Sequence, residues 1–288
     1  MPDPVTAAAG VTVGGALTWA YENRKQITEA LTSLKDWWWK PDNRPILVLG
    51  PGGCGKTTLL RILAGERDWL IDNPWIYNES TGIEKCPLAD DPDVQIVTTP
   101  GQPHRASVYW PDLKVDLAAG RYRGIILLSA YGYHTLGEGI RLRDHPLYRS
   151  RVPKPTQEFL TRYLPNRRGD ELRVLKQLTE PLRSCRERVW LLTVAAKADL
   201  WFDEWDEVQR HYTTGEYGQA ISELVSGLDP ARFRHDLALA SLVIANFSTV
   251  TGDAIQKSIA GYDHQAQIES VRRLIERVIA LKDWEAAV

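Results

Sequence analysis

The chain of 288 residues has a formal net charge of -2, and 43% of its residues are hydrophobic. This length suits one large α/β domain with or without a short extension, and the composition is that of an ordinary globular protein. A near-neutral charge gives no electrostatic attraction to nucleic acid, so no nucleic-acid partner is expected. The three cysteines are scattered, without metal-ligand or disulfide spacing, which is typical of a reducing cytosol.

Residues 1–44 are expected to form an N-terminal extension. Residues 5–21 carry no charge, yet they lack the positive start of a signal peptide and are short and weakly apolar for a membrane span. Residues 27–39 show apolar residues at helical spacing and predict an amphipathic helix. We therefore expect a cytoplasmic protein. Two interpretations of residues 5–21 stay open, namely packing on the domain or a partner, and peripheral contact with a membrane.

A glycine-rich loop is the strongest local signal in the chain. Residues 46–49 form an apolar run typical of a buried strand, and a helical pattern begins at Leu59. Between them stands Gly50-Pro51-Gly52-Gly53-Cys54-Gly55-Lys56-Thr57, followed by Thr58. This is the P-loop pattern, in which backbone N–H groups and a helix N-terminus surround phosphate oxygens. Lys56 would then reach the outer phosphates, and Thr57 would ligate Mg²⁺.

Further elements follow in chain order. A turn-rich loop is expected over residues 68–93 and an irregular basic insertion over 132–155. Apolar runs predict strands at 94–97, 124–130, 189–194 and 242–245. Helical patterns cover 156–186 with a break near Pro165, 201–228 with a break at Gly215, and 265–284. This alternation predicts an α/β domain over 45–288, with a mainly parallel sheet, helices on both faces and ligands at the carboxyl ends of the strands.

Two more motifs follow predicted strands. Thr98-Thr99-Pro100-Gly101-Gln102 comes after the strand at 94–97, and Ala195-Ala196-Lys197-Ala198-Asp199-Leu200 comes after the strand at 189–194. Together with the glycine loop, they make residues 45–284 resemble a GTPase domain of the P-loop family, in the TRAFAC class. The small Ras-like and ADP-ribosylation-factor-like branches are the most similar. The resemblance implies a three-layer P-loop NTPase fold that binds GTP or GDP with Mg²⁺.

The resemblance also implies roles for residues on the phosphate side. Gly101 would sense the terminal phosphate, and Gln102 would orient the attacking water beside Lys56. Thr81 would be a second Mg²⁺ ligand from a switch loop, with Ser80 as a close alternative. Thr98 departs from the family pattern, because it stands where the family has an Asp that helps to hold the metal's water shell. A hydroxyl offers only a weak neutral contact there.

A second group of residues would read the base. Lys197 would lie along the purine, and Asp199, beside Leu200, would accept from the two guanine N–H donors, which adenine lacks. Ala196 replaces the Asn that is usual in the family. Ser248 and Thr249 are expected in a further loop against the guanine.

These residues predict a GTPase that hydrolyses GTP to GDP and phosphate and acts as a nucleotide-dependent switch. A protein partner is expected to bind the switch loops or the basic insertion at 132–155. Two alternatives stay open. One is a nucleotide-bound regulatory or scaffold module with little or no turnover, favoured by the departures at Thr98 and Ala196. The other is an ATP-binding P-loop protein.

Overall fold

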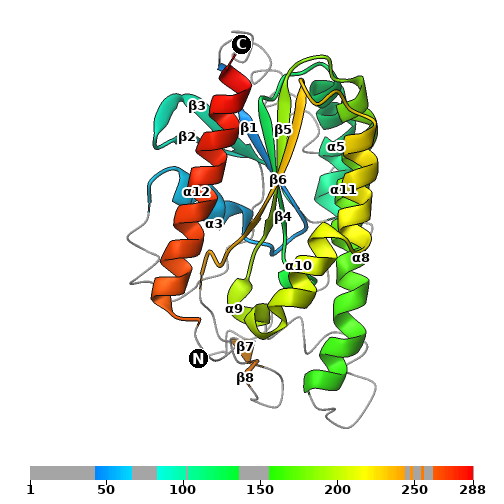
Figure 1. Cartoon of the computed structure of the whole chain (residues 1–288), viewed down its shortest axis with the longest axis vertical. Coiled ribbons are helices and arrows are strands. Elements are labelled where there is room, and N and C mark those ends of the chain that lie inside the picture. The colour runs from blue at the N-terminus through cyan, green and yellow to red at the C-terminus, as the bar shows by residue number, and fades with distance from the viewer. Residues whose placement is uncertain are drawn as a thin grey trace, which may run out of the picture.

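A computed structural model describes residues 43–66, 83–101, 103–135, 156–243, 247–248, 254–255 and 262–287. Its centre is a six-stranded sheet with the order β2-β3-β1-β4-β5-β6 (Figure 1). The strands are β1 (Ile46–Leu49), β2 (Glu84–Leu88), β3 (Asp91–Thr98), β4 (Gly124–Ser129), β5 (Val189–Ala195) and β6 (Phe233–Leu239). β2 is antiparallel to β3, and every other neighbouring pair is parallel. The expected α/β class with a mainly parallel sheet is confirmed.

Helices cover both faces of this sheet (Figure 1). On one face lie α3 (Lys56–Leu63) and α12 (His264–Ala286). On the other lie α5 (Pro103–Ala118), α8 (Thr156–Ser184), α10 (Trp205–Thr213) and α11 (Glu216–Ser226). Because side chains alternate along a strand, Val48 and Ile96 are buried in the core against α3, whereas Leu47 and Val97 are buried in the opposite core.

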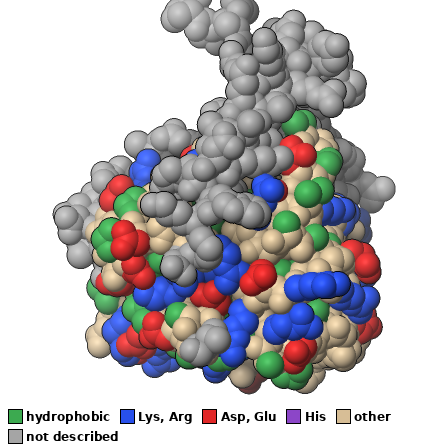
Figure 2. Space-filling view, turned by 90° about the horizontal axis from the view of Figure 1, so that it is seen from above, with side chains coloured by type: hydrophobic (Ala, Val, Ile, Leu, Met, Phe, Trp, Pro, Cys, Tyr) green, Lys and Arg blue, Asp and Glu red, His purple; other side chains and the backbone are tan. Residues whose placement is uncertain are grey.

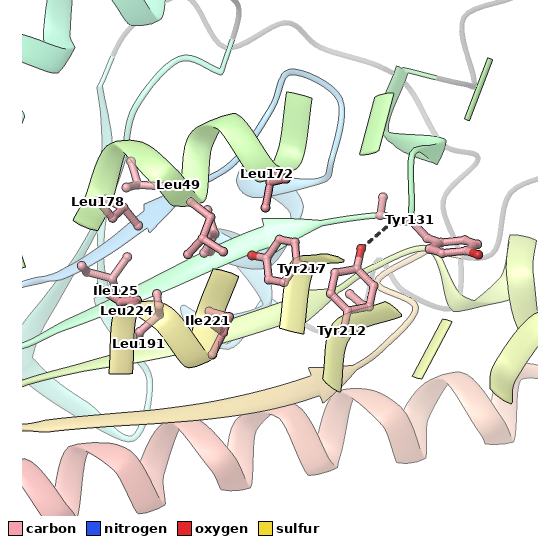
Figure 3. Packing of buried hydrophobic residues seen from close by; sticks show 14 of the residues in the cluster. Leu49, Ile125, Tyr131, Leu172, Leu178, Leu191, Tyr212, Tyr217, Ile221 and Leu224 are labelled. Atoms are coloured by element: carbon pink, nitrogen blue, oxygen red, sulfur yellow. Dashed lines mark hydrogen bonds between the residues drawn. The ribbon is translucent and has the colours of Figure 1, made fainter. Parts of the chain in front are cut away.

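The larger core lies under α8, α10 and α11. Figure 3 shows side chains of these helices interlocking with those of β1, β4 and β5. The same core holds the loop that follows β4, since the backbone N–H of Tyr131 donates to the Tyr212 hydroxyl at 2.9 Å. Tyr131 has a φ of 51°, a conformation that non-glycine residues rarely adopt, so the surrounding packing holds the loop in one shape.

The apolar runs at 46–49, 124–130 and 189–194 are confirmed as β1, β4 and β5, and the break at Gly215 as the gap between α10 and α11. The break expected near Pro165 is wrong, because α8 continues through it. The cost of a helical proline is offset along α8 by leucines buried from Leu160 to Leu182.

Two expectations about strands are also wrong. The region expected to be a loop at 68–93 contains the edge strand β2, in which only Leu88 is buried, so no apolar run announces it. The strand expected at 242–245 is not formed at Leu242 and Val243, and the sixth strand is β6, which ends at Leu239. β6 is an edge strand in which only Phe233 and Ala238 are buried, so it gives a weaker signal than the continuous apolar run of a strand buried on both faces.

Several predicted features lie outside the described residues. They are the N-terminal extension up to residue 42, including 5–21, and the basic insertion from 136 to 155. Within the residues that the structure describes, no helix combines the length and apolar character needed to cross a membrane. Short elements complete the description: α9 (Ala198–Trp201), two 3-10 turns (Tyr133–Thr135 and Phe202–Glu204), and the hairpin of β7 (Phe247–Ser248) and β8 (Ala254–Ile255).

The end of the molecule where α12 finishes carries paired charges. Figure 2 views this end, where basic and acidic side chains are interspersed on the surface. Glu285, only 6% exposed, accepts hydrogen bonds from Arg44 and from Arg123, whose Nη2 lies 2.7 Å away. We call these three residues the charged clasp. It joins the last turn of α12 to the segments that precede β1 and β4.

Candidate functional site

The loops after the parallel strands gather at the opposite end, where α12 begins (Figure 1). β1 lies between β3 and β4 in the sheet. The chain leaves β1 through α3 on one face, and it leaves β3 through α5 on the other face. Such a reversal opens a crevice between the two carboxyl ends, which is where α/β sheets bind ligands. The glycine loop follows β1 and the Thr98–Gly101 loop follows β3, so both loops lie at this point of reversal.

The glycine loop adopts a conformation that its glycines make accessible. Gly50, Gly53 and Gly55 have φ values of 147°, 82° and 99°. A side chain is strained at such angles, and a Cβ on Gly50 would also lie 2.4 Å from the Leu128 carbonyl oxygen. The loop then enters α3 directly at Lys56. Its curled backbone and the helix N-terminus form the arrangement that binds phosphate groups in proteins.

Lys56 is a buried cation held by carbonyl groups of its own loop. It is only 8% exposed, and its Nζ donates to the oxygens of Gly50 and Pro51, both at 3.0 Å. Burial lowers the pKa of Lys56, while Cys54 and Glu84 act in the opposite direction. Neutral carbonyls compensate a buried charge less well than an anion does, so this ammonium group is placed to accept an anionic ligand.

Gly101 packs directly onto the glycine loop. A Cβ at this position would lie 2.1 Å from Lys56 Nζ, 2.6 Å from the Gly50 oxygen and 2.7 Å from the Gly52 nitrogen. The structure therefore brings together two motifs that are about fifty positions apart in the chain, and it explains why the position has no side chain. Gln102, the neighbouring predicted catalytic residue, lies outside the described residues.

Thr98 is fully buried at the end of β3. Its hydroxyl donates to the Val48 oxygen at 3.2 Å, so its proton serves to join β3 to β1. The described residues contain no cluster of three or more His, Cys, Asp or Glu side chains that could hold a metal ion. A Mg²⁺ ion that accompanies a nucleotide takes most of its ligands from phosphate oxygens, water and one hydroxyl. Thr57, in the first turn of α3, can supply that hydroxyl. Thr81 lies outside the described residues.

On the other side of the glycine loop, Lys197 and Asp199 follow β5. Lys197 has a φ of 60°, and its Nζ donates to the oxygens of Tyr133 and His134 at 2.8 and 3.2 Å. It also lies near the glycine loop, because it helps to offset the rise that burial causes in the pKa of Cys54. Asp199 is 1% exposed, and its Oδ1 accepts from the Ser241 hydroxyl at 2.5 Å.

The loop after β6 links this side to the glycine loop. Ser241 contacts Asp199, and the next residue, Leu242, lies against the glycine loop, since a Cβ on Gly55 would be 3.2 Å from its Cδ1. Gln267 of α12 donates to the Leu242 oxygen at 3.1 Å. Sequence reasoning missed Ser241, because it took 242–245 as the strand. The available signal for β6 was the even spacing of Phe233, Leu237 and Leu239, which places them on one face of a strand.

The sequence predicts Ser248 and Thr249 in the loop against the guanine. Ser248 belongs to β7, which pairs with β8 in a separate two-stranded sheet. Thr249 lies outside the described residues. The loop that directly follows the sixth strand, and that touches Asp199, is therefore the one at 240–243.

Sequence reasoning also missed Glu171, a buried carboxylate on α8. Its Oε1 accepts from the backbone nitrogens of Ala130 and Gly132 at 2.8 and 2.9 Å, and its Oε2 accepts from the Tyr212 hydroxyl at 3.0 Å. Glu171 thereby shapes the loop whose carbonyl groups hold Lys197. No pattern in the sequence marks such a residue, because its partners are brought together only by the tertiary fold.

No protein-family model matches the chain, and no curated protein is significantly similar to it in sequence. The function is therefore inferred from the site itself. Of the predicted residues, Lys56 and Gly101 pack together and Lys197 lies near Cys54 of the glycine loop. Asp199 is linked to that loop through Ser241, whose neighbour Leu242 lies near Gly55. Leu200, which follows Asp199 in α9, is buried in the core and supports that helix.

Proposed function

We propose that the chain is a P-loop GTPase that binds GTP with Mg²⁺, hydrolyses it to GDP and phosphate, and acts as a nucleotide-dependent switch. The observation that carries this proposal is the packing of Gly101 on Lys56 and on the backbone of the glycine loop. A terminal phosphate bound by Lys56 must contact or displace Gly101. Occupancy of that position by phosphate would thus change the loop after β3, as a switch requires.

The phosphate side would act through the glycine loop, Lys56, Thr57 and Gln102. Backbone N–H groups of the glycine loop and the first turn of α3 would bind phosphate oxygens, while the Lys56 ammonium exchanges its carbonyl partners for the β- and γ-phosphates. Thr57 would be the hydroxyl ligand of Mg²⁺, which when bound neutralises charge on those phosphates. Gln102 would orient the attacking water. The carbonyl contacts of Lys56 support this part of the proposal, because they hold its charge over the loop.

The residues after β5 would select guanine over adenine. Asp199 would accept from two guanine N–H donors, and the Ser241 hydroxyl at 2.5 Å keeps its carboxylate in position. Lys197, fixed by the carbonyls of Tyr133 and His134, would cover one face of the purine with its alkyl stem. Adenine offers an acceptor where guanine offers a donor, so the same carboxylate would disfavour ATP.

One specific observation favours a second candidate, a nucleotide-bound module with little turnover. Thr98 replaces the family's carboxylate, and its hydroxyl is hydrogen-bonded to Val48 instead of facing a metal. Measuring phosphate release over many turnovers distinguishes the two candidates. Release that Gln102→Leu slows without weakening GTP binding supports a GTPase. Stable nucleotide binding without release supports the module.

Nucleotide selectivity tests the proposal most directly. Isothermal titration of the full chain with GTPγS and ATPγS, in Mg²⁺, should give tighter binding of the guanine nucleotide by about tenfold or more, the usual effect of losing a charged hydrogen bond. Asp199→Asn should remove this preference. Asp203→Asn, on the 3-10 turn that follows α9, is the matched control and should keep it. Equal affinity of the unaltered chain for both nucleotides would rule out guanine recognition.

A further inference from the structure

An acidic side chain stands beside the position where Thr98 leaves the family pattern. Glu84 is the first residue of β2, and in the antiparallel pairing of β2 with β3 it lies directly opposite Thr98. Residues paired in this way project to the same face of a sheet. Thr98 shares its face with Ile96, which is buried in the core against α3. Glu84 therefore projects to the α3 face, at the end of the sheet that carries the glycine loop.

The contacts between β2 and α3 place Glu84 at the beginning of that helix. The backbone N–H of Ala89 donates to the Leu63 oxygen at 2.9 Å, and the Cys86 thiol donates to the Leu60 oxygen at 3.4 Å. Earlier residues of β2 therefore lie beside earlier residues of α3. Two strand residues span about 7 Å, as do four to five helical residues. The next residue of β2 on this face, Glu84, consequently lies level with the first turn, where Thr57 stands.

The electrostatic interaction between Glu84 and Lys56 also places Glu84 near the first turn of α3. Lys56 and Thr57 are neighbours in the first turn of α3, and Glu84 is close enough to Lys56 to act against the lowering of its pKa by burial. Glu84 is half-buried, so part of its side chain is exposed at this end of β2. The two acids of β3, Asp91 and Asp93, lie toward the other end of that strand, and Asp91 pairs with Lys282 at 2.9 Å.

We infer that Glu84 supplies the acidic group on the metal side of the nucleotide site, in place of the carboxylate that is absent at Thr98. The inference rests on the proposed function, since it concerns the Mg²⁺ that accompanies the nucleotide. A carboxylate on the neighbouring strand presents a negative charge to the same face as one at position 98. It can therefore support metal binding through the ion's water ligands, as outer carboxylates do in other metal sites.

Manganese binding tests this role without relying on turnover. The full chain is loaded with GDP, stripped of divalent ions, and titrated with Mn²⁺ while free Mn²⁺ is followed by electron paramagnetic resonance. Glu84→Gln should weaken Mn²⁺ binding by about ten- to a hundredfold, the usual effect of losing a supporting carboxylate. Its affinity for GDP in excess EDTA should stay within twofold of the unaltered chain. Glu84→Asp, which keeps the charge, should retain most of the Mn²⁺ affinity.

Glu66→Gln is the matched control, because Glu66 is an exposed acid just beyond the other end of α3, and it should leave Mn²⁺ binding unchanged. Mn²⁺ affinity of Glu84→Gln within twofold of the unaltered chain would overturn the inference and leave the proposed function standing. Equal losses of GDP binding with and without metal would also overturn it. Failure of the unaltered chain to bind GDP would instead refute the proposed function.

Discussion

Buried cations at the two ends of the sheet have different kinds of partner. In the charged clasp, Arg44 and Arg123 share the Glu285 carboxylate, so that positive and negative groups are buried together. At the glycine loop, the Lys56 ammonium is buried to a similar degree, but its hydrogen bonds within the described residues go to two neutral carbonyls. Burying a charge is costly unless it is paired. The charges of the clasp therefore compensate one another, whereas Lys56 forms no ion pair within the described residues and its charge would be stabilised further by an anionic ligand.

Whether a buried cation has its counter-charge in the same chain distinguishes a structural charge from a ligand-binding one. A structural cation has its counter-charge in the same chain, and removing either partner destabilises the fold. A ligand-binding cation has incomplete compensation, and removing it changes binding more than stability. The comparison can be tested at both ends with matched measurements.

The largest effect on stability is expected at the clasp. Glu285→Gln leaves two arginines, 16% and 12% exposed, without their counter-charge. We expect the free energy of unfolding to fall by about 3 kcal/mol in urea denaturation, as for other broken buried pairs. Glu276→Gln on the same helix is the control, because Glu276 pairs with Arg272 at the surface and should cost less than about 0.5 kcal/mol. Similar losses for both variants would show that the clasp is an ordinary surface ion pair.

Lys56→Ala should have the reverse profile. It removes the ammonium group that we propose binds phosphate, so affinity for GTP should drop at least about 100-fold, equivalent to about 2.7 kcal/mol. Stability without nucleotide should hardly fall, because burial already disfavours the charged form, as the lowered pKa indicates. Arg61→Ala, an exposed position on the same helix, should change neither quantity. A loss of stability as large as that of Glu285→Gln would make Lys56 a structural cation and contradict the comparison.

The sequence predicts well the parts of the molecule that depend on local pattern. β1, β4 and β5 are central strands buried on both faces, so their apolar runs are unmistakable. The glycine loop is similarly local, because its unusual φ values demand glycine at fixed spacing. The edge strands β2 and β6 were not predicted, because each exposes or half-exposes most of its side chains and resembles a loop in composition.

The site was predicted only in part for a related reason. Lys56, Gly101, Lys197 and Asp199 belong to short motifs that follow central strands, and their meeting at one end follows from the parallel arrangement. Ser241 and Glu84 depend on where the edge strands begin and end, and so they could not be found until β6 and β2 were placed. Glu171 reaches its loop from the middle of a long helix. Its role is set by packing between segments far apart in the chain.

The smallest expected effect concerns the contact between the two phosphate-side loops. Gly101→Ala places a methyl group within 2.7 Å of three atoms, two of which are backbone atoms of the glycine loop that cannot swing aside. We expect a stability loss of about 1–2 kcal/mol without nucleotide, typical of overpacking.

Gly169→Ala, in α8, is the matched control because a Cβ there meets no atom within 4 Å, and alanine should stabilise the helix by about 0.5–1 kcal/mol. If Gly101→Ala is as stable as the unaltered chain, the loop after β3 does not rest on the glycine loop, and the link between phosphate binding and movement of that loop is lost. If it is destabilised and the loss disappears when saturating GTP displaces the loop, the two loops compete for the same space beside Lys56, which is the property that a nucleotide switch needs.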